Sequence, residues 1–265
     1  MLPLYYEYHN PVKILSGEAA LENIPYELHA LEAHAPLLLS DQGLKQVGAV
    51  DTVLHAIAPT VPKAIFTDIP ADSSVAVVNQ IAAYYKEQGC DSILAVGGGS
   101  VIDTAKGVRM VISQNTNDIE SLMGCEVLTA GRHIPFLAVP TTAGTGSEVT
   151  PVAVISNPQK QVKQEYLSAH LLPDAAILDL RMTMTLPPKV TASTGIDALC
   201  HAIESFTCLQ KNPMSDAYAA GAIPLIMRHL PIAAAHPGNK EARKAMANAS
   251  LMAGTSFGNS MVGLV

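Results

Sequence analysis

The sequence predicts an α/β fold, with a parallel sheet in the N-terminal part and an all-helical C-terminal part. Short apolar runs rich in β-branched residues alternate with helical patterns as far as about Pro187, which is typical of parallel βαβ units. Beyond Pro187 the strand patterns cease and helical patterns follow. The 265 residues are 49% apolar and only 15% charged, so the chain has enough apolar side chains for a sizeable core.

The first predicted elements are four apolar runs, which we expect to be buried parallel strands. They cover residues 36–40, 63–68, 92–100 and 135–142. Residues 73–89 lie between the second and third runs and predict a helix, because they begin with serine and end with glycine. Residues 152–168 predict a hairpin that turns at Asn157 and Pro158, and residues 175–179 predict a further strand.

The last part of the chain is predicted to be helical. The helical patterns cover residues 194–207, 215–230 and 239–258, and a Leu-Pro-Pro run precedes them. Proline is a strong punctuator of local structure, so we place a boundary there. The prediction is two domains, residues 1–187 with the sheet and residues 188–265 with the helices.

Charge and hydrophobicity exclude several classes of partner. The net charge of -7 and the lack of a Lys/Arg run argue against nucleic acid and anionic membrane surfaces. The N-terminus lacks the basic segment of a signal peptide, and no run reaches the roughly 18 apolar residues of a membrane span. We expect a soluble, cytoplasmic protein. The four cysteines match no zinc pattern, so we expect reduced, mostly buried thiols at Cys90, Cys125, Cys200 and Cys208.

A glycine-rich turn joins the third apolar run to a helical pattern in "AVGGGSVIDTAKG", residues 95–107. Glycines let the backbone approach a ligand closely, and the following helix N-terminus offers free N–H groups to an anion. Ile102 stands where a Rossmann fingerprint has its third glycine, and no Walker A lysine is present. The turn is therefore either an anion site or a tight structural turn with Asp103 in the first turn of the helix.

A polar loop, "PTTAGTGSEVT", closes the fourth apolar run at residues 140–150. A loop of this composition directly after a buried strand usually faces a ligand. Since ligands of open α/β sheets bind outside the carboxyl ends of the strands, we expect the glycine and threonine loops to lie side by side at one end of the sheet.

The helical part carries a second polar pattern in "TGIDALCHAIE", residues 194–204. Asp197 and His201 are four residues apart on a predicted helix and share one face, so they can hold one cation or pair with each other. Glu204 follows three residues later and can orient the imidazole. We expect the pair to face a cleft between the two domains.

Four segments together resemble the iron-containing (group III) alcohol dehydrogenase family. They are "GGGSVIDTAKG", "PTTAGTGSEVT", "LDLRMTMTLPPKVTASTGIDALCHAIE" and "LMAGTSFGNSMVGLV", in the order and spacing of that family over nearly the whole chain. The resemblance implies a dinucleotide-binding α/β domain and an all-helical domain, here incomplete at the C-terminus. It also implies NAD(P) and a divalent metal in the cleft between the domains.

The resemblance assigns the cofactor contacts residue by residue. The matching positions are Gly98, Gly99 and Ser100 at the pyrophosphate, Asp103 in the same loop, Thr141, Thr142, Thr150 and Val152 along the cofactor, and Lys163 at the ribose. Asp41 matches the acidic residue that accepts from the adenosine ribose, and its charge favours NAD over NADP. Residues 67–74 depart from the family, because many relatives carry an Asn-Pro-Thr run there.

The resemblance also makes Asp197 and His201 the first two ligands of the catalytic metal, with Fe²⁺ favoured and Zn²⁺ as the alternative. In the family two further histidines complete the site, and the first follows a run like "GNSMVGLV". The sequence stops at Val265, where that ligand is expected. We therefore expect a chain that keeps the cofactor site but is a poor or inactive enzyme by itself, with the apolar end 249–265 partly exposed.

The implied function is an NAD-dependent, metal-dependent alcohol dehydrogenase that interconverts a small primary alcohol and its aldehyde, acting as a homodimer or larger homo-oligomer. The metal would act as a Lewis acid on the substrate oxygen. Two alternatives stay open. One is a catalytically incomplete nucleotide-binding fragment, and the other is a related polyol or sugar-phosphate dehydrogenase of the same superfamily.

Overall fold

The computed structural model describes residues 3–123 and 130–262. Its centre is a six-stranded sheet in the order β1-β8-β5-β4-β2-β3, in which all paired strands are parallel. The strands are β1 (Lys13–Gly17), β2 (Pro36–Leu39), β3 (Ala64–Phe66), β4 (Ser92–Gly97), β5 (Phe136–Pro140) and β8 (Ala175–Asp179). The predicted fold class and its five predicted parallel strands are confirmed. The sequence pattern does not predict β1, because this edge strand is mixed in polarity and largely exposed.

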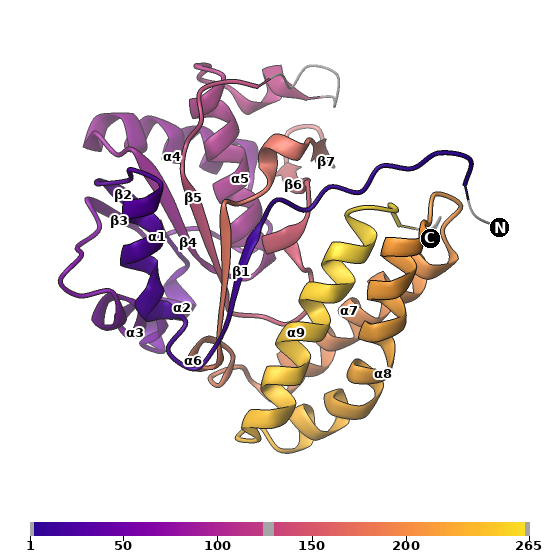
Figure 1. Cartoon of the computed structure of the whole chain (residues 1–265). Helices are drawn as coiled ribbons and strands as arrows, with labels where there is room; N and C mark the ends of the chain where they lie inside the picture. The colour runs from indigo at the N-terminus through magenta and orange to yellow at the C-terminus, as the bar shows by residue number, and fades with distance from the viewer. Residues whose placement is uncertain (1–2, 124–129, 263–265) are drawn as a thin grey trace.

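Helices cover both faces of the sheet (Figure 1). One face carries α4 (Val75–Gln88) and α5 (Gly99–Ser113), and the other carries α1 (Ile24–Ala30) and α3 (Ala49–Ala56). Neighbouring residues of one strand therefore enter different cores, with Leu37 and Leu39 in the first and Leu38 in the second. Burial on both faces explains why these strands are continuous apolar runs.

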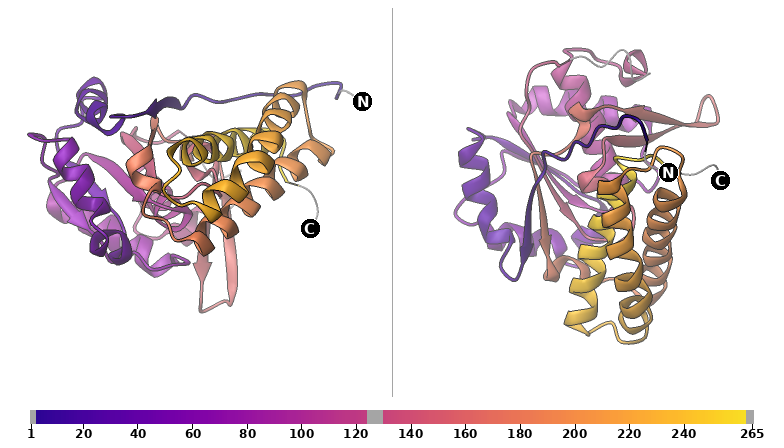
Figure 2. Two further views of the ribbon diagram at one scale, coloured as in Figure 1. Left: turned by 90° about the horizontal axis from the view of Figure 1, so that it is seen from below. Right: turned by 45° about the vertical axis from the view of Figure 1, so that its right-hand side comes forward.

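Short elements complete this part of the chain. They are α2 (Gln42–Gln46), α6 (Leu180–Thr183) and the 3-10 helices η1 (Leu21–Asn23), η2 (Ile119–Leu122), η3 (Ser147–Val149) and η4 (Ala169–Leu171). The predicted hairpin is confirmed as β6 (Val152–Asn157) paired antiparallel with β7 (Val162–Leu167). It stands out from the parallel sheet and extends beside the helical part (Figure 2).

The helical part consists of α7 (Pro188–Thr207), α8 (Pro213–Ala235) and α9 (Lys240–Phe257), which pack on one another. α7 begins six residues before the predicted start, because Pro188 occupies the first helical position, where a missing N–H costs nothing. α8 continues through Pro231 instead of ending before it. The start of α7 coincides with the proposed boundary at residue 187, although the division into two domains stays a prediction.

The expected partial exposure of the chain's apolar end is confirmed only at its last described residues, where Met261 is 40% and Val262 44% exposed. From Ala249 to Ser260, α9 and the turn after it are buried or half-buried between α7, α8 and η3. The exposed apolar face belongs to α7, where Ile196 is 52% and Ile203 46% exposed. For residues 249–260 the expectation is wrong, because apolar composition does not reveal which helix of a bundle is covered. Residues 263–265 lie outside the described residues.

Three of the four cysteines lie within the described residues. Cys90, Cys200 and Cys208 are free thiols, as expected. The expected burial is wrong for Cys200, which lies on the exposed face of α7, and only partial for the other two. Cys125 lies outside the described residues. Among the described helices, none has the length and hydrophobicity needed to cross a membrane.

Candidate functional site

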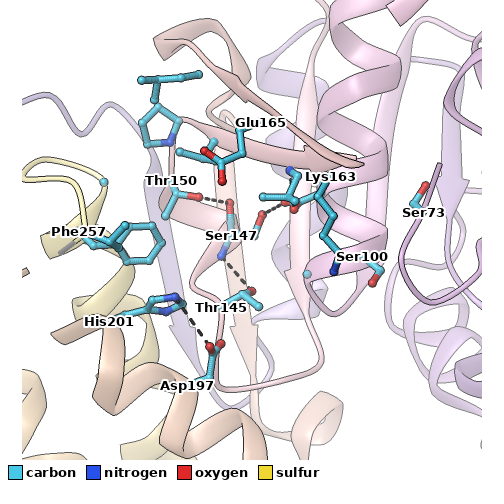
Figure 3. A pocket seen from close by; sticks show the side chains of 18 of the residues that line it. Ser73, Ser100, Thr145, Ser147, Thr150, Lys163, Glu165, Asp197, His201 and Phe257 are labelled. Atoms are coloured by element: carbon cyan, nitrogen blue, oxygen red, sulfur yellow. Dashed lines mark hydrogen bonds and ion pairs between the residues drawn. The ribbon is translucent and has the colours of Figure 1, made fainter. Parts of the chain in front are cut away.

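A cavity of about 500 Å³ lies where the carboxyl end of β4, the hairpin and the helices α7 and α9 meet. Eight of the predicted site residues line it: Gly99, Ser100, Asp103, Thr150, Val152, Lys163, Asp197 and His201. Figure 3 shows Ser100 and Lys163 on one side of this space, and Asp197 and His201 on the helical side. The fold thus brings the predicted cofactor loops and the predicted metal pair to one cavity.

The glycine and threonine loops lie side by side at the carboxyl ends of neighbouring strands, which confirms the predicted arrangement. Gly97 pairs with Pro140, and the N–H of Thr141 donates to the Gly97 carbonyl over 3.0 Å. A Cβ atom at Gly99 would stand only 2.8 Å from the Cγ2 atom of Thr145. The Thr145 side chain therefore packs directly on the Gly99 backbone and leaves no room for a side chain there.

Four predicted cofactor residues do not line the cavity, although all four lie at the same end of the sheet. They are Asp41, Gly98, Thr141 and Thr142. Asp41 follows β2 and caps α2, where its Oδ1 atom accepts from the Leu44 N–H over 2.8 Å. Its half-buried side chain stands two strands away from the threonine loop, since β4 lies between β2 and β5.

Helix α5 holds the polypeptide that forms one wall of the cavity. The carboxylate of Asp103 accepts from the Ser147 hydroxyl over 2.5 Å and from the Val154 N–H over 3.0 Å. One turn later, the ammonium of Lys106 donates to the carbonyls of Thr150 over 2.8 Å and Val152 over 2.6 Å. These contacts bind α5 to η3 and to the start of β6. Asp103 thus has two protein partners besides facing the cavity.

Burial controls the charges of this network. Lys106 is fully buried, and burial lowers the pKa of its ammonium to about 8 against the opposing pull of Asp103 and Glu148. Burial likewise raises the pKa of the Glu148 carboxyl to about 7, and it raises the pKa of Asp103. Lys106 and Glu148 were not among the predicted site residues. The sequence could have pointed to them, because each is a charged residue at a position of its motif where a buried apolar residue is expected.

Asp197 and His201 face the cavity from α7, as predicted. The Nε2 atom of His201 lies 3.8 Å from the Asp197 Oδ1 atom, with 22% and 43% of the two side chains exposed. The imidazole packs against Phe257 in a tilted arrangement, with ring centroids 4.5 Å apart and an interplanar angle of 37°. In the described part of the chain no hydrogen bond joins His201 to Glu204, so Phe257 and not Glu204 holds the ring.

The donor set of this pair fits a divalent cation in part. The Nε2 atom of His201 is the ring nitrogen nearest the Asp197 carboxylate and could share an ion with it, whereas the buried Nδ1 atom has no hydrogen-bond partner among the described residues. Imidazole nitrogen and carboxylate oxygen are common ligands of Zn²⁺, and of iron as well. Within residues 3–123 and 130–262, however, no group of three His, Cys, Asp or Glu side chains converges as a metal site would require.

Comparisons with known proteins agree with this geometry. The model of the family "Iron-containing alcohol dehydrogenase" matches residues 11–180, and that of "Fe-containing alcohol dehydrogenase family, C-terminal" matches residues 191–265. The probable alcohol dehydrogenase EutG of Salmonella typhimurium is 37% identical over 255 residues, which are 96% of this chain but 64% of that protein. The NAD-dependent methanol dehydrogenase of Bacillus methanolicus is 34% identical, over 96% of this chain and 67% of that protein.

A solved structure matches at similar identity. The sulfoacetaldehyde reductase of Bifidobacterium kashiwanohense in complex with NAD⁺ superposes with a TM-score of 0.91 at 33% identity. The match covers 98% of this chain and 69% of that one. The chain therefore spans about two thirds of the length of the relatives it matches.

Proposed function

The chain belongs to the iron-containing alcohol dehydrogenase family, and on that premise we propose that it functions as an NAD-dependent, metal-dependent alcohol dehydrogenase. The reaction would interconvert a small primary alcohol and its aldehyde by hydride transfer. The observation that carries the proposal is that the glycine loop and the Asp197–His201 pair line one and the same cavity. Hydride transfer needs the nicotinamide ring and the substrate carbon close together, with the substrate oxygen at the metal.

For the cofactor, we propose that the pyrophosphate binds at the N-terminus of α5. Gly99 and Ser100 provide N–H groups and a hydroxyl there, and the helix dipole favours an anion. Thr150 and Val152 would line the path toward the nicotinamide, with Lys163 at the ribose. The relatives support NAD as the cofactor, since one is named NAD-dependent and another was solved with NAD⁺.

For the metal, we propose that Asp197 and His201 supply two ligands to Fe²⁺, with Zn²⁺ as the alternative. A divalent ion bound there would polarise the alcohol or aldehyde oxygen. The protein's own contribution is to hold the two donors on one helix face and to pack the imidazole against Phe257. As a further part of the proposal, the enzyme works in the cytoplasm as a homo-oligomer.

The proposal is tested by comparing the catalytic turnover of this chain with that of a longer version. The 265-residue chain and a version lengthened to the size of its relatives are purified with Fe²⁺ or Zn²⁺, and NADH formation is followed with primary alcohols of increasing length. We expect metal-dependent turnover in the longer protein and weak or no turnover in the shorter one. Loss of activity on chelation must be restored by the metal. Failure of both proteins to oxidise any primary alcohol or bind NAD would contradict the proposal.

A second candidate function is nucleotide binding without catalysis. It is favoured by the lack of a three-residue metal cluster among the described residues. Metal stoichiometry separates the two functions, because a dehydrogenase of this type binds one ion per catalytic site. A chain that binds NAD tightly but retains no Fe²⁺ or Zn²⁺ supports the second candidate.

A further inference from the structure

An ion pair bridges two elements at the mouth of the cavity. The ammonium of Lys163, on β7, lies 2.9 Å from the Oδ1 atom of Asp72, in the loop before α4. Both residues line the cavity, and both side chains are more than half exposed. Lys163 is the residue proposed to reach the cofactor ribose, so Asp72 already holds a group that the cofactor would use.

The backbone, and not a loose side chain, brings Asp72 to this position. Asp72 adopts a left-handed conformation with φ of 54°, which aspartate tolerates better than most residues, and its N–H donates to the Ser100 hydroxyl over 3.3 Å. The next residue is anchored as well, because the carbonyl of Ser73 accepts from the Ser156 N–H over 2.8 Å. These contacts hold the backbone of Asp72 beside the N-terminus of α5, so its carboxylate lies near that helix end.

Two further groups point to an anion at this place. α5 is 15 residues long, and Gly99 and Ser100 of its first turn line the cavity. Ser73 is 98% buried and also lines the cavity, yet its hydroxyl has no hydrogen-bond partner among the described residues. A phosphate oxygen would supply that partner and would also complement the helix dipole. Asp72 puts a negative charge at the edge of this anion site.

We propose that Asp72 is an internal competitor of the cofactor pyrophosphate, which lowers the affinity for NAD by repelling the phosphates and by holding Lys163. The inference rests on the proposed function, since it assumes that NAD binds in this cavity. The physical basis is the interaction of like charges at a partly exposed site, where Coulomb energies are modest but measurable.

The test replaces Asp72 by its uncharged isostere. Asp72→Asn should bind NAD and ADP-ribose about 3- to 10-fold more tightly than the unmodified chain at low salt, as expected for one like charge at this range. The gain should shrink at high salt, and affinity for adenosine, which has no phosphate, should be unchanged. Asp51→Asn is the matched control, because Asp51 is an exposed aspartate on α3 outside the cavity.

Lys163→Met separates the two parts of the proposal. If Asp72 acts partly by holding Lys163, the gain from Asp72→Asn must be smaller in the Lys163→Met background than in the unmodified chain. Unchanged or weaker NAD binding by Asp72→Asn would overturn the inference and leave the proposed function intact. If neither the unmodified chain nor Asp72→Asn binds NAD or ADP-ribose, the proposed function fails and the inference fails with it.

Discussion

The two walls of the cavity are built differently. On the α/β wall, Lys106 and Asp103 are bound to the polypeptide of η3 and β6 by hydrogen bonds, and Gly99 packs against Thr145 with no room for a side chain. On the helical wall, Asp197 is 43% exposed and the buried His201 Nδ1 atom has no partner among the described residues. The α/β wall is held mainly by its own hydrogen bonds, although the Ser73 hydroxyl has no partner among the described residues, whereas the helical wall has no such network around its proposed metal ligands.

This difference indicates how the binding of the cofactor and of the metal ion would depend on the protein. A wall that is already ordered loses little conformational entropy when its ligand binds. Substitutions in the hydrogen-bond network that orders the α/β wall should therefore be poorly tolerated. At the proposed metal site, the ion itself would join Asp197 and His201. The predictions below test whether the α/β wall is the rigid one, and they run from the largest expected effect to the smallest.

The largest effect is expected for Lys106→Met. The change keeps the length of the side chain but removes the cation between Asp103 and Glu148, and it leaves the carbonyls of Thr150 and Val152 without their donor. Breaking a buried charge cluster on one side costs about 3–5 kcal/mol. We expect the free energy of unfolding in urea to fall by that amount.

Lys86→Met is the control for this change. Lys86, on α4, donates to the Thr116 carbonyl and the Asn117 side chain at the surface. Exposed contacts of this kind are worth less than about 1 kcal/mol. If both variants lost the same small amount, the α/β wall would not be the preassembled one.

The next effect concerns the helical wall. His201→Ala should lower the affinity for Fe²⁺ or Zn²⁺ by about 100-fold, since even residues that only support a metal ligand contribute 10- to 100-fold. The midpoint of thermal unfolding without metal should change little, because the ring is part of an open site. Metal titration and calorimetry measure the two quantities on one sample.

His229→Ala is the matched control, because His229 lies on α8 outside the cavity. A collapse of thermal stability in His201→Ala with unchanged metal content would show that Asp197 and His201 form a structural pair instead of a metal site.

A smaller effect should appear in the pH dependence of stability. Burial raises the pKa of Glu148 from 4.5 to about 7 in the folded chain, so the folded state favours the protonated form. The resulting stability is fully present below pH 4.5 and is lost as the pH rises through 7. Glu148→Gln cannot ionise, so its advantage over the unmodified chain should grow to about 1–2 kcal/mol at pH 8.

Urea unfolding between pH 4.5 and 8 measures this difference, and Lys106, whose pKa burial lowers to about 8, begins to lose its proton in the folded chain only at the upper end of this range. Glu87→Gln, at an exposed position of α4, should show no such trend. A difference that stays constant with pH would mean that Glu148 is ionised in the folded protein at all these values.

The smallest effect is expected at Asp41, outside the cavity. Asp41→Asn keeps the cap on α2 but removes the charge, so it should narrow the preference for NAD over NADP by about 10-fold without loss of stability. Titration with both cofactors measures the ratio. Equal affinities in the unmodified chain would contradict the assignment of Asp41 to the adenosine ribose.

Much of the fold was predictable because its signals are local. β2, β4, β5 and β8 are continuous apolar runs, since helices bury both faces of each strand. α4 ends at Gly89 in a left-handed conformation, as the sequence predicts. Local patterns failed at the edge strand β1, because its residues are largely exposed and of mixed polarity.

For the site, the sequence determined the motif positions, and eight of them line one cavity. The tertiary structure alone decided what those residues touch. Lys106 binds a carbonyl 44 residues away at Thr150, and Lys163 pairs with Asp72 across 91 residues. No periodicity or spacing rule reports such contacts, because they depend on which segments pack together once the core is formed. The exposure of α7 in place of the end of α9 has the same cause.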